Sequence, residues 1–308
     1  DNYKPLPVVL SRAKGVWAWD VNEKKYLDMM SGYSAVSHGH AHPELLRVFH
    51  EQSSKLSLTS RAFYTDTLGP YLETITKISG FEMCLPMNSG AEAVETAIKS
   101  SRRWAYRTKK VKPGKAEIIV AEGNFHGRTT TIISFSTDEN SRHDFGPHTP
   151  GFVTVKYGCA ESLEAAINEH TAAVLIEPIQ GEAGIVVPPE NYLPKVREIC
   201  SKHNVLMILD EIQSGLGRTG KLFAYEHSNI QPDGLILGKA LGGGFMPVSC
   251  FLSSEEVLHW MNPGSHGSTF GGNPLAAALA KRSIELLEEE GLIENSRIMG
   301  DYFKESLL

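Results

Sequence analysis

The sequence of 308 residues is poor in cysteine, lacks long apolar runs and has no excess of positive charge. Its four cysteines lie far apart and form no C-x-x-C pair, which indicates free thiols in a reducing compartment. No apolar run approaches the roughly 20 residues that cross a bilayer. The net charge of −6 argues against the basic face that nucleic acid requires. We therefore expect neither a membrane nor a nucleic-acid partner.

What the sequence does contain is the composition of a globular protein, with 41% hydrophobic and 21% charged residues. After Pro86, apolar strand-like runs alternate with stretches of helical spacing. This alternation predicts an α/β fold with a mostly parallel central sheet between helices, and ligands bind such sheets at the carboxyl ends of the strands. The expected strands are Glu117–Ala121, Ala172–Glu177, Val205–Asp210, Leu235–Gly238 and Ser249–Leu252, and the expected helices between them are Glu92–Tyr106, Ser162–Glu169 and Tyr192–His203.

Three regions are expected along the chain. Residues 1–40 predict a small N-terminal arm with a hairpin, residues 41–290 a large domain, and residues 291–308 the start of a further domain. A helix is expected from Pro43 to about Leu56, and another after Pro274. The first residue is not Met, and the helical spacing of the last residues runs to Leu308 without a capping signal. We therefore expect a trimmed N-terminus and a truncated C-terminal domain.

Asp210 and Lys239 are the strongest candidates for chemistry. Asp210 ends the apolar run Val205–Leu209, where an unpaired acid is costly, and it suits a partner for a protonated ring nitrogen. Lys239 follows another strand and precedes glycines, which favours a lysine of lowered pKa that forms a Schiff base. The alternatives are a structural ion pair for Asp210 and a snorkelling side chain for Lys239. About one helix and one strand separate them, so both can lie at one rim of the sheet.

Two segments rich in glycine and hydroxyl groups are candidate phosphate sites. Ser89, Gly90 and Ala91 open a strong helix, whose free backbone N–H groups favour an anion. The segment Gly264–Pro274 contains Ser268 and Thr269. An ordinary N-cap and a simple turn explain the two segments equally well when each is taken alone.

Three weaker patterns leave alternatives open. The segment Gly215–Gly220 fits G-x-G-x-x-G, but no convincing helix follows it, so we discount a dinucleotide site. The segment His38–His42 contains three histidines without supporting acids or cysteines, which favours structural histidines over a metal site. Phe125 could stack on a flat ring, and Arg128 could grip a carboxylate or lie at the surface.

Together these motifs resemble the class III aminotransferases of pyridoxal 5'-phosphate (PLP) fold type I, and most closely the members that use ornithine. The resemblance spans essentially the whole chain and includes the segments Asn2–Pro7, Gly32–Val36, Leu58–Tyr64, Leu85–Glu92, Glu177–Gly184, Asp210–Gln213, Gly238–Gly244 and Ser268–Thr269. It implies PLP as cofactor and a homodimer with shared active sites. His126 departs from the tryptophan that some ornithine enzymes carry after the stacking phenylalanine, and this segment does not choose between ornithine and N-acetylornithine.

The resemblance also implies a role for each candidate residue. Lys239 would hold the cofactor and Asp210 would face the pyridine nitrogen, while Gln213 would bond the ring hydroxyl and Phe125 would stack on the ring. The phosphate would lie on Ser89, Gly90 and Ala91, with Ser268 and Thr269 from the other subunit. The substrate residues would be Tyr3, Tyr33 and Arg128 for ornithine, together with Glu182, which would pair with an arginine of the C-terminal domain and release it for 2-oxoglutarate.

The expected function is therefore PLP-dependent δ-transamination of L-ornithine with 2-oxoglutarate, in ornithine catabolism and proline biosynthesis. The alternative within the family is a transaminase for N-acetylornithine or another ω-amino acid. Two other classes stay open: a nicotinamide-dependent oxidoreductase built on Gly215–Gly220, and an inactive binding protein of the same fold. We expect the cytoplasm, or the mitochondrial matrix if the protein is of animal type, and no metal ion.

Overall fold

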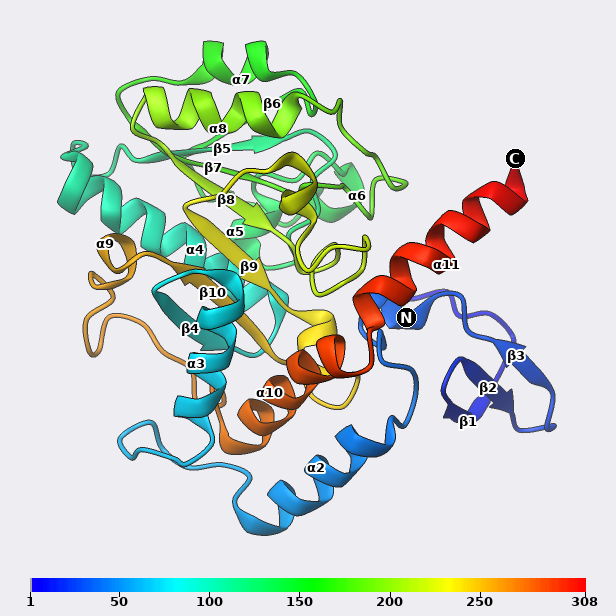
Figure 1. Cartoon of the computed structure of the whole chain (residues 1–308). Coiled ribbons are helices and arrows are strands. Elements are labelled where there is room, and N and C mark those ends of the chain that lie inside the picture. The colour runs from blue at the N-terminus through cyan, green and yellow to red at the C-terminus, as the bar shows by residue number, and fades with distance from the viewer. Residues whose placement is uncertain (1) are drawn as a thin grey trace.

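The computed structural model describes residues 2–308, and a seven-stranded sheet forms its centre (Figure 1). The strand order is β4-β10-β9-β8-β7-β5-β6. The pairs from β9 through β6 are parallel, whereas β10 is antiparallel to both of its neighbours. The strands are β4 (Met83–Met87), β5 (Glu117–Ala121), β6 (Phe152–Val155), β7 (Thr171–Ile176), β8 (Leu206–Asp210), β9 (Gly234–Leu237) and β10 (Ser249–Ser253).

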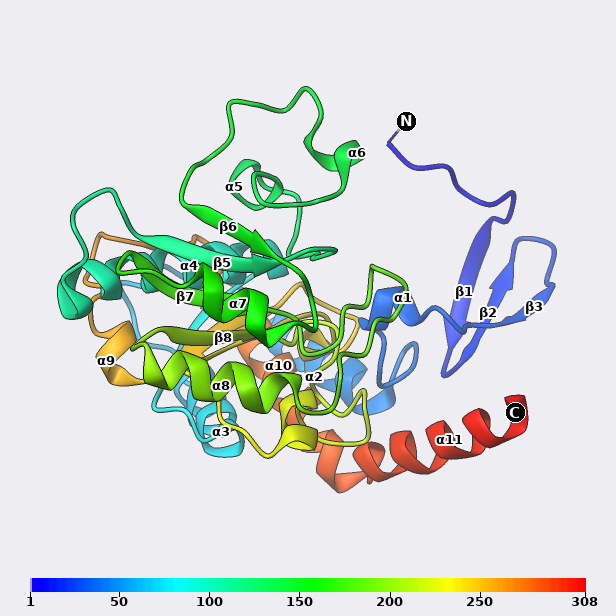
Figure 2. The same ribbon diagram turned by 90° about the horizontal axis from the view of Figure 1, so that it is seen from above.

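Helices cover both faces of this sheet, as Figures 1 and 2 show. Alternate residues of each strand point to opposite faces. On one face, helices α4 and α9 pack with Ile118, Ala173, Ile208 and Ile236. The adjacent residues of the same strands point to the other face and pack with α3, α8 and α10. Because both faces are buried, the central strands are apolar throughout. The larger helices are α2 (Pro43–Lys55), α3 (Leu68–Ser79), α4 (Gly90–Trp104), α7 (Ala160–Ala166), α8 (Tyr192–Lys202), α10 (Pro274–Glu289) and α11 (Leu292–Leu307).

Short helical segments complete the structure between these elements. A π-helix, η1, prolongs α4, and the 3-10 helices η2 and η3 follow β8 and β9 along the chain. They are α1 (Ser31–Ser34), η1 (Ala105–Lys109), α5 (Thr130–Ile133), α6 (Glu139–Arg142), η2 (Ala224–Ser228), η3 (Lys239–Gly242) and α9 (Glu255–Leu258). Among residues 2–308, no helix is both long and apolar enough to cross a membrane.

The N-terminal arm is a separate three-stranded antiparallel sheet at the edge of the molecule (Figure 2). Its strands are β1 (Leu10–Lys14), β2 (Trp17–Asp20) and β3 (Lys25–Leu27). The predicted hairpin is confirmed as β2 and β3, and β1 adds a strand that the sequence did not suggest. Asp20 accepts hydrogen bonds from the backbone N–H groups of Asn22 and Lys24, which fixes the turn between β2 and β3.

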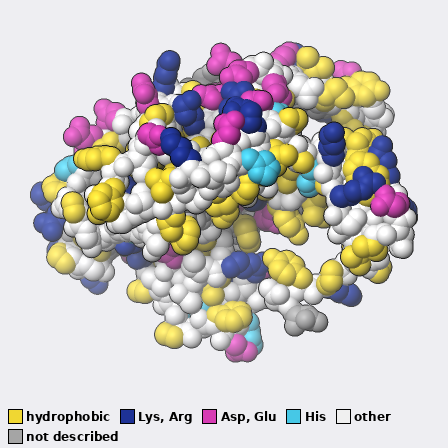
Figure 3. All heavy atoms as spheres, turned by 90° about the horizontal axis from the view of Figure 1, so that it is seen from below, with side chains coloured by type: hydrophobic (Ala, Val, Ile, Leu, Met, Phe, Trp, Pro, Cys, Tyr) yellow, Lys and Arg dark blue, Asp and Glu magenta, His cyan; other side chains and the backbone are white. Residues whose placement is uncertain are grey.

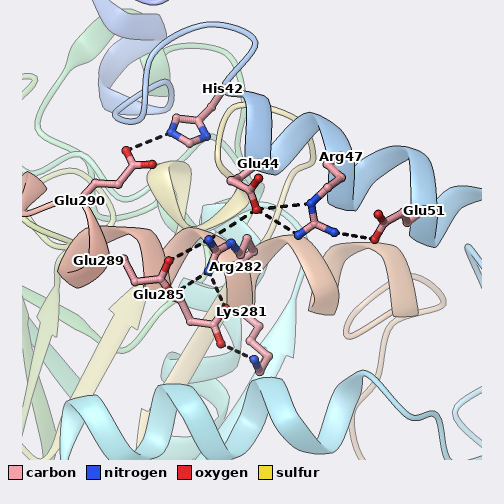
Figure 4. Close-up of polar contacts among 9 residues, drawn as sticks. All are labelled: His42, Glu44, Arg47, Glu51, Lys281, Arg282, Glu285, Glu289 and Glu290. Carbon is pink, nitrogen blue, oxygen red and sulfur yellow. Dashed lines mark hydrogen bonds and ion pairs between the residues drawn. The ribbon is translucent and has the colours of Figure 1, made fainter.

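A network of ion pairs joins α2 to α10 beneath the sheet (Figure 4). The guanidinium of Arg282 donates to both carboxylate oxygens of Glu289, each at 2.8 Å, and lies 3.5 Å from Glu44 of α2. Arg47 pairs in turn with Glu44 and Glu51 on its own helix. A network with bidentate geometry resists side-chain motion better than isolated surface pairs do. It holds α10 in the position from which its apolar residues pack against η3.

The predicted core elements are confirmed to within a few residues, and the helices expected after Pro43 and Pro274 are α2 and α10. The elements α3, β4 and β6 were not predicted, although the apolar residues of α3 recur at helical spacing and bury Tyr71 and Ile75 on one face. The region boundaries proposed near residues 40 and 290 stay predictions. In the structure, α10 ends at Glu289, Gly291 adopts a left-handed conformation, and α11 begins at Leu292.

Candidate active site

A cavity of about 190 Å³ opens at the carboxyl ends of β7, β8 and β9. This is the edge at which parallel sheets bind ligands. The lining combines an acid at the end of a strand, a lysine after another strand, and the start of α4. Its residues are Gly90, Ala91, Phe125, His126, Gly127, Glu177, Ile179, Glu182, Asp210, Ile212, Gln213 and Lys239.

Asp210 is the last residue of β8 and only 5% exposed. One carboxylate oxygen accepts from His126 Nδ1 at 2.7 Å, and the other accepts the backbone N–H of Ile212 at 3.0 Å. Burial by itself lowers the pKa of His126, but the hydrogen bond and charge of Asp210, aided by Glu177, raise it above its usual value. A carboxylate held by two donors keeps a fixed orientation and still has lone pairs for a ligand.

Lys239 follows β9 at the first position of η3 and lines the same cavity. Burial lowers the pKa of its ammonium, although the carboxylates of Glu182, Asp210 and Glu177 act in the opposite direction. Its backbone has φ = 45°, a left-handed conformation that costs free energy in a residue other than glycine. An amine of lowered pKa at a strained position is typical of a nucleophile or a base.

Glu177 follows β7 directly and is, after Asp210, the second buried acidic group that lines the cavity. Its Oε2 accepts the backbone N–H of Phe125 at 3.1 Å. Burial raises the pKa of Glu177 to about 7, with the charge of Asp210 acting in the same direction and that of His126 against it. The carboxyl group therefore changes its charge near neutral pH, next to the Asp210–His126 pair.

The start of α4 forms another wall of the cavity. Ser89 and Glu92 make a capping box, in which each side chain accepts the other residue's backbone N–H. The N–H groups of Gly90 and Ala91, in the first turn, have no acceptor within the helix. A β-carbon on Gly90 would lie 2.8 Å from Ile212 Cδ1, so glycine allows the close approach of these segments. These N–H groups, at the positive end of the helix, suit a phosphate.

Gln213 and Glu182 contact each other at the mouth of the cavity. Gln213 Nε2 donates to Glu182 Oε1 at 3.0 Å, and a β-carbon on Gly181 would overlap Gln213 Oε1. The amide is thus held between Glu182 and the backbone of Gly181. Both residues are predicted site residues, and the structure brings them together at the cavity.

Arg128 lies in a neighbouring cavity of about 360 Å³, which shares Phe125, His126, Gly127 and Glu182 with the first. Its guanidinium lies 5.4 Å from the centre of the Phe125 ring, within range of a cation–π contact. No ion pair fixes Arg128 within residues 2–308. The guanidinium is therefore available to a carboxylate that enters beside Phe125.

Five predicted residues do not line either cavity in the single chain, and these are Ser89, Tyr3, Tyr33, Ser268 and Thr269. Tyr3 and Tyr33 belong to the N-terminal arm and are 75% and 55% exposed. Ser268 accepts from Asn88 Nδ2 at 2.8 Å, beside the start of α4, and Thr269 follows it. The assignment of Ser268 and Thr269 to another subunit's site stays a prediction.

The histidines of the His38–His42 segment each have a partner in the protein. His38 bonds the carbonyl of Ser283, His40 bonds Asp28, and His42 bonds Glu290. Within residues 2–308, no three His, Cys, Asp or Glu side chains are grouped to hold a metal ion. The Gly215–Gly220 segment forms turns after β8 and precedes η2, so it does not open the helix that a dinucleotide site requires.

Comparison with known proteins places these features in a family. The model of the family described as aminotransferase class-III matches residues 1–308. The chain belongs to this family. Class III aminotransferases have PLP fold type I, in agreement with the sheet and helices described above, and depend on PLP. The expected fold class, enzyme class and cofactor are therefore confirmed.

Relatives within the class III family are similar over nearly the whole chain. The ornithine aminotransferase of Brevibacillus brevis is 55% identical over 99% of this chain and 77% of its own length. An ornithine aminotransferase structure from Toxoplasma gondii has a TM-score of 0.98 at 43% identity, covering 99% of this chain and 72% of that one. The acetylornithine aminotransferase of Elizabethkingia anophelis has a TM-score of 0.89 at 47% identity, covering 99% and 74%.

The residues of the cavity fit PLP. Asp210 offers a buried carboxylate for a pyridinium nitrogen, Lys239 an amine for the aldehyde carbon, and Gly90 and Ala91 free N–H groups for the phosphate. The buried Nε2 of His126, a residue that lines the cavity, has no hydrogen-bond partner among residues 2–308. This donor set is chemically that of a PLP site in a class III aminotransferase.

Sequence reasoning missed His126 and Glu177 as parts of this site. His126 was noted only as a departure from a tryptophan, although it follows Phe125 near the end of β5. Glu177 follows an apolar strand in the same way as Asp210 ends one, and that position was the available signal. Only the fold shows that His126 bonds Asp210 and that Glu177 lines the same cavity.

Proposed function

We propose that this class III aminotransferase transfers the δ-amino group of L-ornithine to 2-oxoglutarate, giving glutamate 5-semialdehyde and glutamate. The observation that carries the proposal is the placement of Lys239 and Asp210 on one buried cavity, in a chain 55% identical to an ornithine aminotransferase. Within that cavity, an amine of lowered pKa and an oriented carboxylate supply the two functions that transamination needs.

Bound PLP supplies an electron sink for the pair of electrons released when a proton leaves the substrate carbon. Asp210 would hold the proton on the pyridine nitrogen, and His126 keeps Asp210 in the required orientation. Lys239 would take the proton from the δ-carbon of ornithine and deliver it to the cofactor as general base and then acid. Its lowered pKa increases the fraction of free amine at neutral pH, which this role requires.

The cofactor would be held by groups on three sides. Ser89, Gly90 and Ala91 would bind the phosphate, Phe125 would stack on the ring, and Gln213 would bond the ring hydroxyl after leaving Glu182. In a homodimer, Ser268 and Thr269 of one subunit would reach the phosphate in the other. Support comes from the free N–H groups at the start of α4 and from the position of Gln213 on the cavity.

Ornithine and 2-oxoglutarate differ in charge where they meet the protein, so one pocket must serve both. Arg128, Tyr3 and Tyr33 would bind the α-amino and α-carboxylate groups of ornithine, leaving the δ-amine to reach the cofactor. Glu182 would neutralise an arginine contributed by a further part of the protein and release it for the 2-oxoglutarate carboxylate. The hydrogen bond from Gln213 gives Glu182 a second partner, which such a switch requires.

N-Acetylornithine is the alternative substrate, because an acetylornithine aminotransferase is 47% identical with a TM-score of 0.89. The test is the absorption spectrum of the purified chain with PLP, before and after addition of each amino donor. A protein-bound yellow band that ornithine bleaches supports the proposal, and formation of glutamate from 2-oxoglutarate completes it. Bleaching by N-acetylornithine and not by ornithine would identify N-acetylornithine as the amino donor. Absence of the band at saturating PLP would overturn the proposal for this chain.

We also propose that the protein is a homodimer of the cytoplasm that acts in ornithine catabolism and proline biosynthesis. Apolar side chains lie at the surface on the face shown in Figure 3. Exposed ones on the arm and on α11 include Leu10, Val16, Trp17, Met299 and Phe303, which suits burial in an interface. The four cysteines are all free, as a reducing compartment would require. Sedimentation with and without PLP would test the dimer.

A further inference from the structure

The segment from Gly264 to Gly272 lies against α4 and is fastened to it by His266. His266 Nε2 is 2.8 Å from Thr96 Oγ1, and His266 Nδ1 is 2.8 Å from Lys99 Nζ. The ammonium of Lys99 also approaches the carbonyl of Ser265 at 3.4 Å. Thr96 and Lys99 are both on α4, so one imidazole bridges the segment to a single face of this helix.

The partners of His266 allow only one arrangement of hydrogens. Thr96 is fully buried, and its hydroxyl donates to the carbonyl of Glu92 at 2.7 Å. Because that hydroxyl has one proton, it accepts from His266, which places a proton on Nε2. Lys99 has only donors, so Nδ1 must accept from it. The bridge therefore requires a neutral imidazole with its proton on Nε2.

A second fastening connects the segment to the start of α4, where the cavity lies. Glu92 accepts from the backbone N–H of Ser89 at 2.7 Å and from the amide of Asn88 at 3.2 Å. The same amide group donates to Ser268 Oγ at 2.8 Å, and Ser268 Oγ also accepts the backbone N–H of Gly271 at 3.0 Å. The position of Ser268 is therefore set by two contacts, one with Asn88 just before α4 and one with α4 itself through His266.

We propose that His266 is a positioning residue that holds the segment 264–272 against α4 only while its imidazole is neutral. The inference rests on the proposed function in one respect, that Ser268 and Thr269 contribute to the phosphate site. Protonation of Nδ1 turns the acceptor into a positively charged donor opposite the ammonium of Lys99. The bridge then opens, and the segment that contains Ser268 and Thr269 loses its order.

The charges around His266 favour the neutral form. Burial and the positive charge of Lys99 lower the pKa of His266, whereas Glu92 and Glu95 act in the opposite direction without reversing the shift. These three charged groups all lie on α4 and are the ones that face the imidazole. Since the pKa in the folded state lies below the usual 6.5, the bridge is complete above that value and is lost as the pH falls further.

The experiment compares the unaltered chain with His266→Gln and His259→Gln. Glutamine can donate to Thr96 but does not titrate in this range, and His259 bonds only the carbonyl of Glu255 in its own turn. Hydrogen exchange of residues 264–272, corrected for the intrinsic pH dependence, is followed from pH 8 to pH 5. We expect protection in the unaltered chain and His259→Gln to fall about tenfold or more, since a bond to a charged group is lost. In His266→Gln protection stays constant.

PLP affinity, measured by fluorescence titration over the same range, provides the second readout. Between pH 8 and pH 5, we expect the dissociation constant for PLP to increase by a factor that is several-fold larger in the unaltered chain than in His266→Gln. Acid-independent protection in the unaltered chain, or the same loss in His266→Gln, would overturn the inference. Nitrogen chemical shifts of His266 that show a proton on Nδ1 at pH 8 would also overturn it. A chain that binds no PLP at pH 8 contradicts the proposed function instead, while hydrogen exchange still tests the bridge.

Discussion

The two sides of the active site differ in how they are built. On the inner side, Asp210, His126 and Glu177 are buried at or beyond the ends of strands. His126 bonds Asp210, and Glu177 accepts the backbone N–H of Phe125. On the outer side, Tyr3 and Tyr33 are exposed and touch neither cavity. Buried polar groups cost free energy unless they are paired, so the fold itself fixes their positions. Exposed side chains on an arm have no such constraint.

This difference separates the general chemistry from the choice of substrate. The cofactor chemistry is proposed for groups that a single chain positions with its own sheet. The recognition of a particular amino acid is proposed for residues that need another segment or subunit to complete their surroundings. The variants below test this division, from the largest expected effect to the smallest.

Replacing Lys239, which lines the same cavity as the inner-side residues, has the largest expected effect. Lys239→Ala removes both the covalent attachment point and the general base, so turnover should fall by at least about 10⁴-fold. Mass spectrometry after borohydride reduction should find PLP on the peptide with Lys239 in the unaltered chain and not in the variant. Lys221→Ala, at an exposed lysine, serves as the control and should retain both properties. Turnover by Lys239→Ala close to the unaltered rate would contradict the assignment.

Asp210→Asn should lower kcat by about 10²- to 10³-fold, because it removes a preorganised charge opposite the cofactor ring. The covalent link through Lys239 should persist, so the loss appears in kcat after saturation with PLP. Asp66→Asn, at an exposed aspartate paired with Lys55, is the matched control. If Asp210→Asn turned over normally, the carboxylate would have only a structural role.

Glu177→Gln should change how stability depends on pH. The folded-state pKa of about 7 lies above the usual 4.5, so the protonated carboxyl contributes stability fully below pH 4.5, and this is lost as the pH rises through 7. Relative to the unaltered chain, the glutamine variant should gain on the order of 3 kcal/mol in unfolding free energy over that range. Urea denaturation of the two chains without PLP at pH 5, 6, 7 and 8 measures this difference. A difference that does not change with pH would show that Glu177 is ionised throughout.

Gly127→Ala should destabilise the wall between the two cavities. Gly127 has φ = 128°, and an added β-carbon would lie 2.9 Å from the β-carbon of Ala91. We expect a loss of about 1–3 kcal/mol in unfolding free energy and weaker PLP binding, because Ala91 lines the cavity and belongs to the proposed phosphate site. Gly69→Ala is the control, since nothing lies within 4 Å of its added β-carbon and its φ is ordinary. Equal stability of the two variants would contradict the close packing at Gly127.

Tyr33→Phe should have the smallest effect. Loss of one hydrogen bond to ornithine is worth about 1 kcal/mol, so KM for ornithine should rise roughly fivefold with little change in kcat. PLP affinity should not change, because the tyrosine does not line the cofactor cavity. Steady-state kinetics with ornithine and N-acetylornithine provide the measurement. A large fall in kcat or in PLP affinity would assign Tyr33 to the inner side. It would contradict the separation of cofactor chemistry from substrate recognition.

Much of the fold could be predicted from local patterns. The central strands β7, β8 and β9 are buried on both faces and appear as continuous apolar runs, and the capping box at Ser89 marks the start of α4. Among the elements that were missed, α3 has a helical spacing that was not recognised, whereas β4 and β6 are short strands with mixed patterns. Their burial depends on which side of each element faces the sheet, and that information is not local.

The candidate site shows the same limit at the level of single residues. Asp210 and Lys239 were accessible to sequence reasoning because a charge at the end of an apolar strand is unusual. The sequence did not predict that His126 and Glu177 line the same cavity as Asp210 and Lys239. These four residues lie at or beyond the ends of different strands and are far apart in the chain. The contact of Gln213 with Glu182 and the bridge from His266 to Thr96 likewise join distant segments.

The sequence by itself determined the α/β class, the principal elements and the candidacy of Asp210 and Lys239, because periodicity and the cost of burying charge act over a few residues. The identity of the cofactor came from the resemblance to the family. Only the tertiary structure decided the strand order, the antiparallel β10, the partners of Asp210 and the raised pKa of Glu177. Those properties depend on distances between groups that the chain separates and on the water that packing excludes from between them.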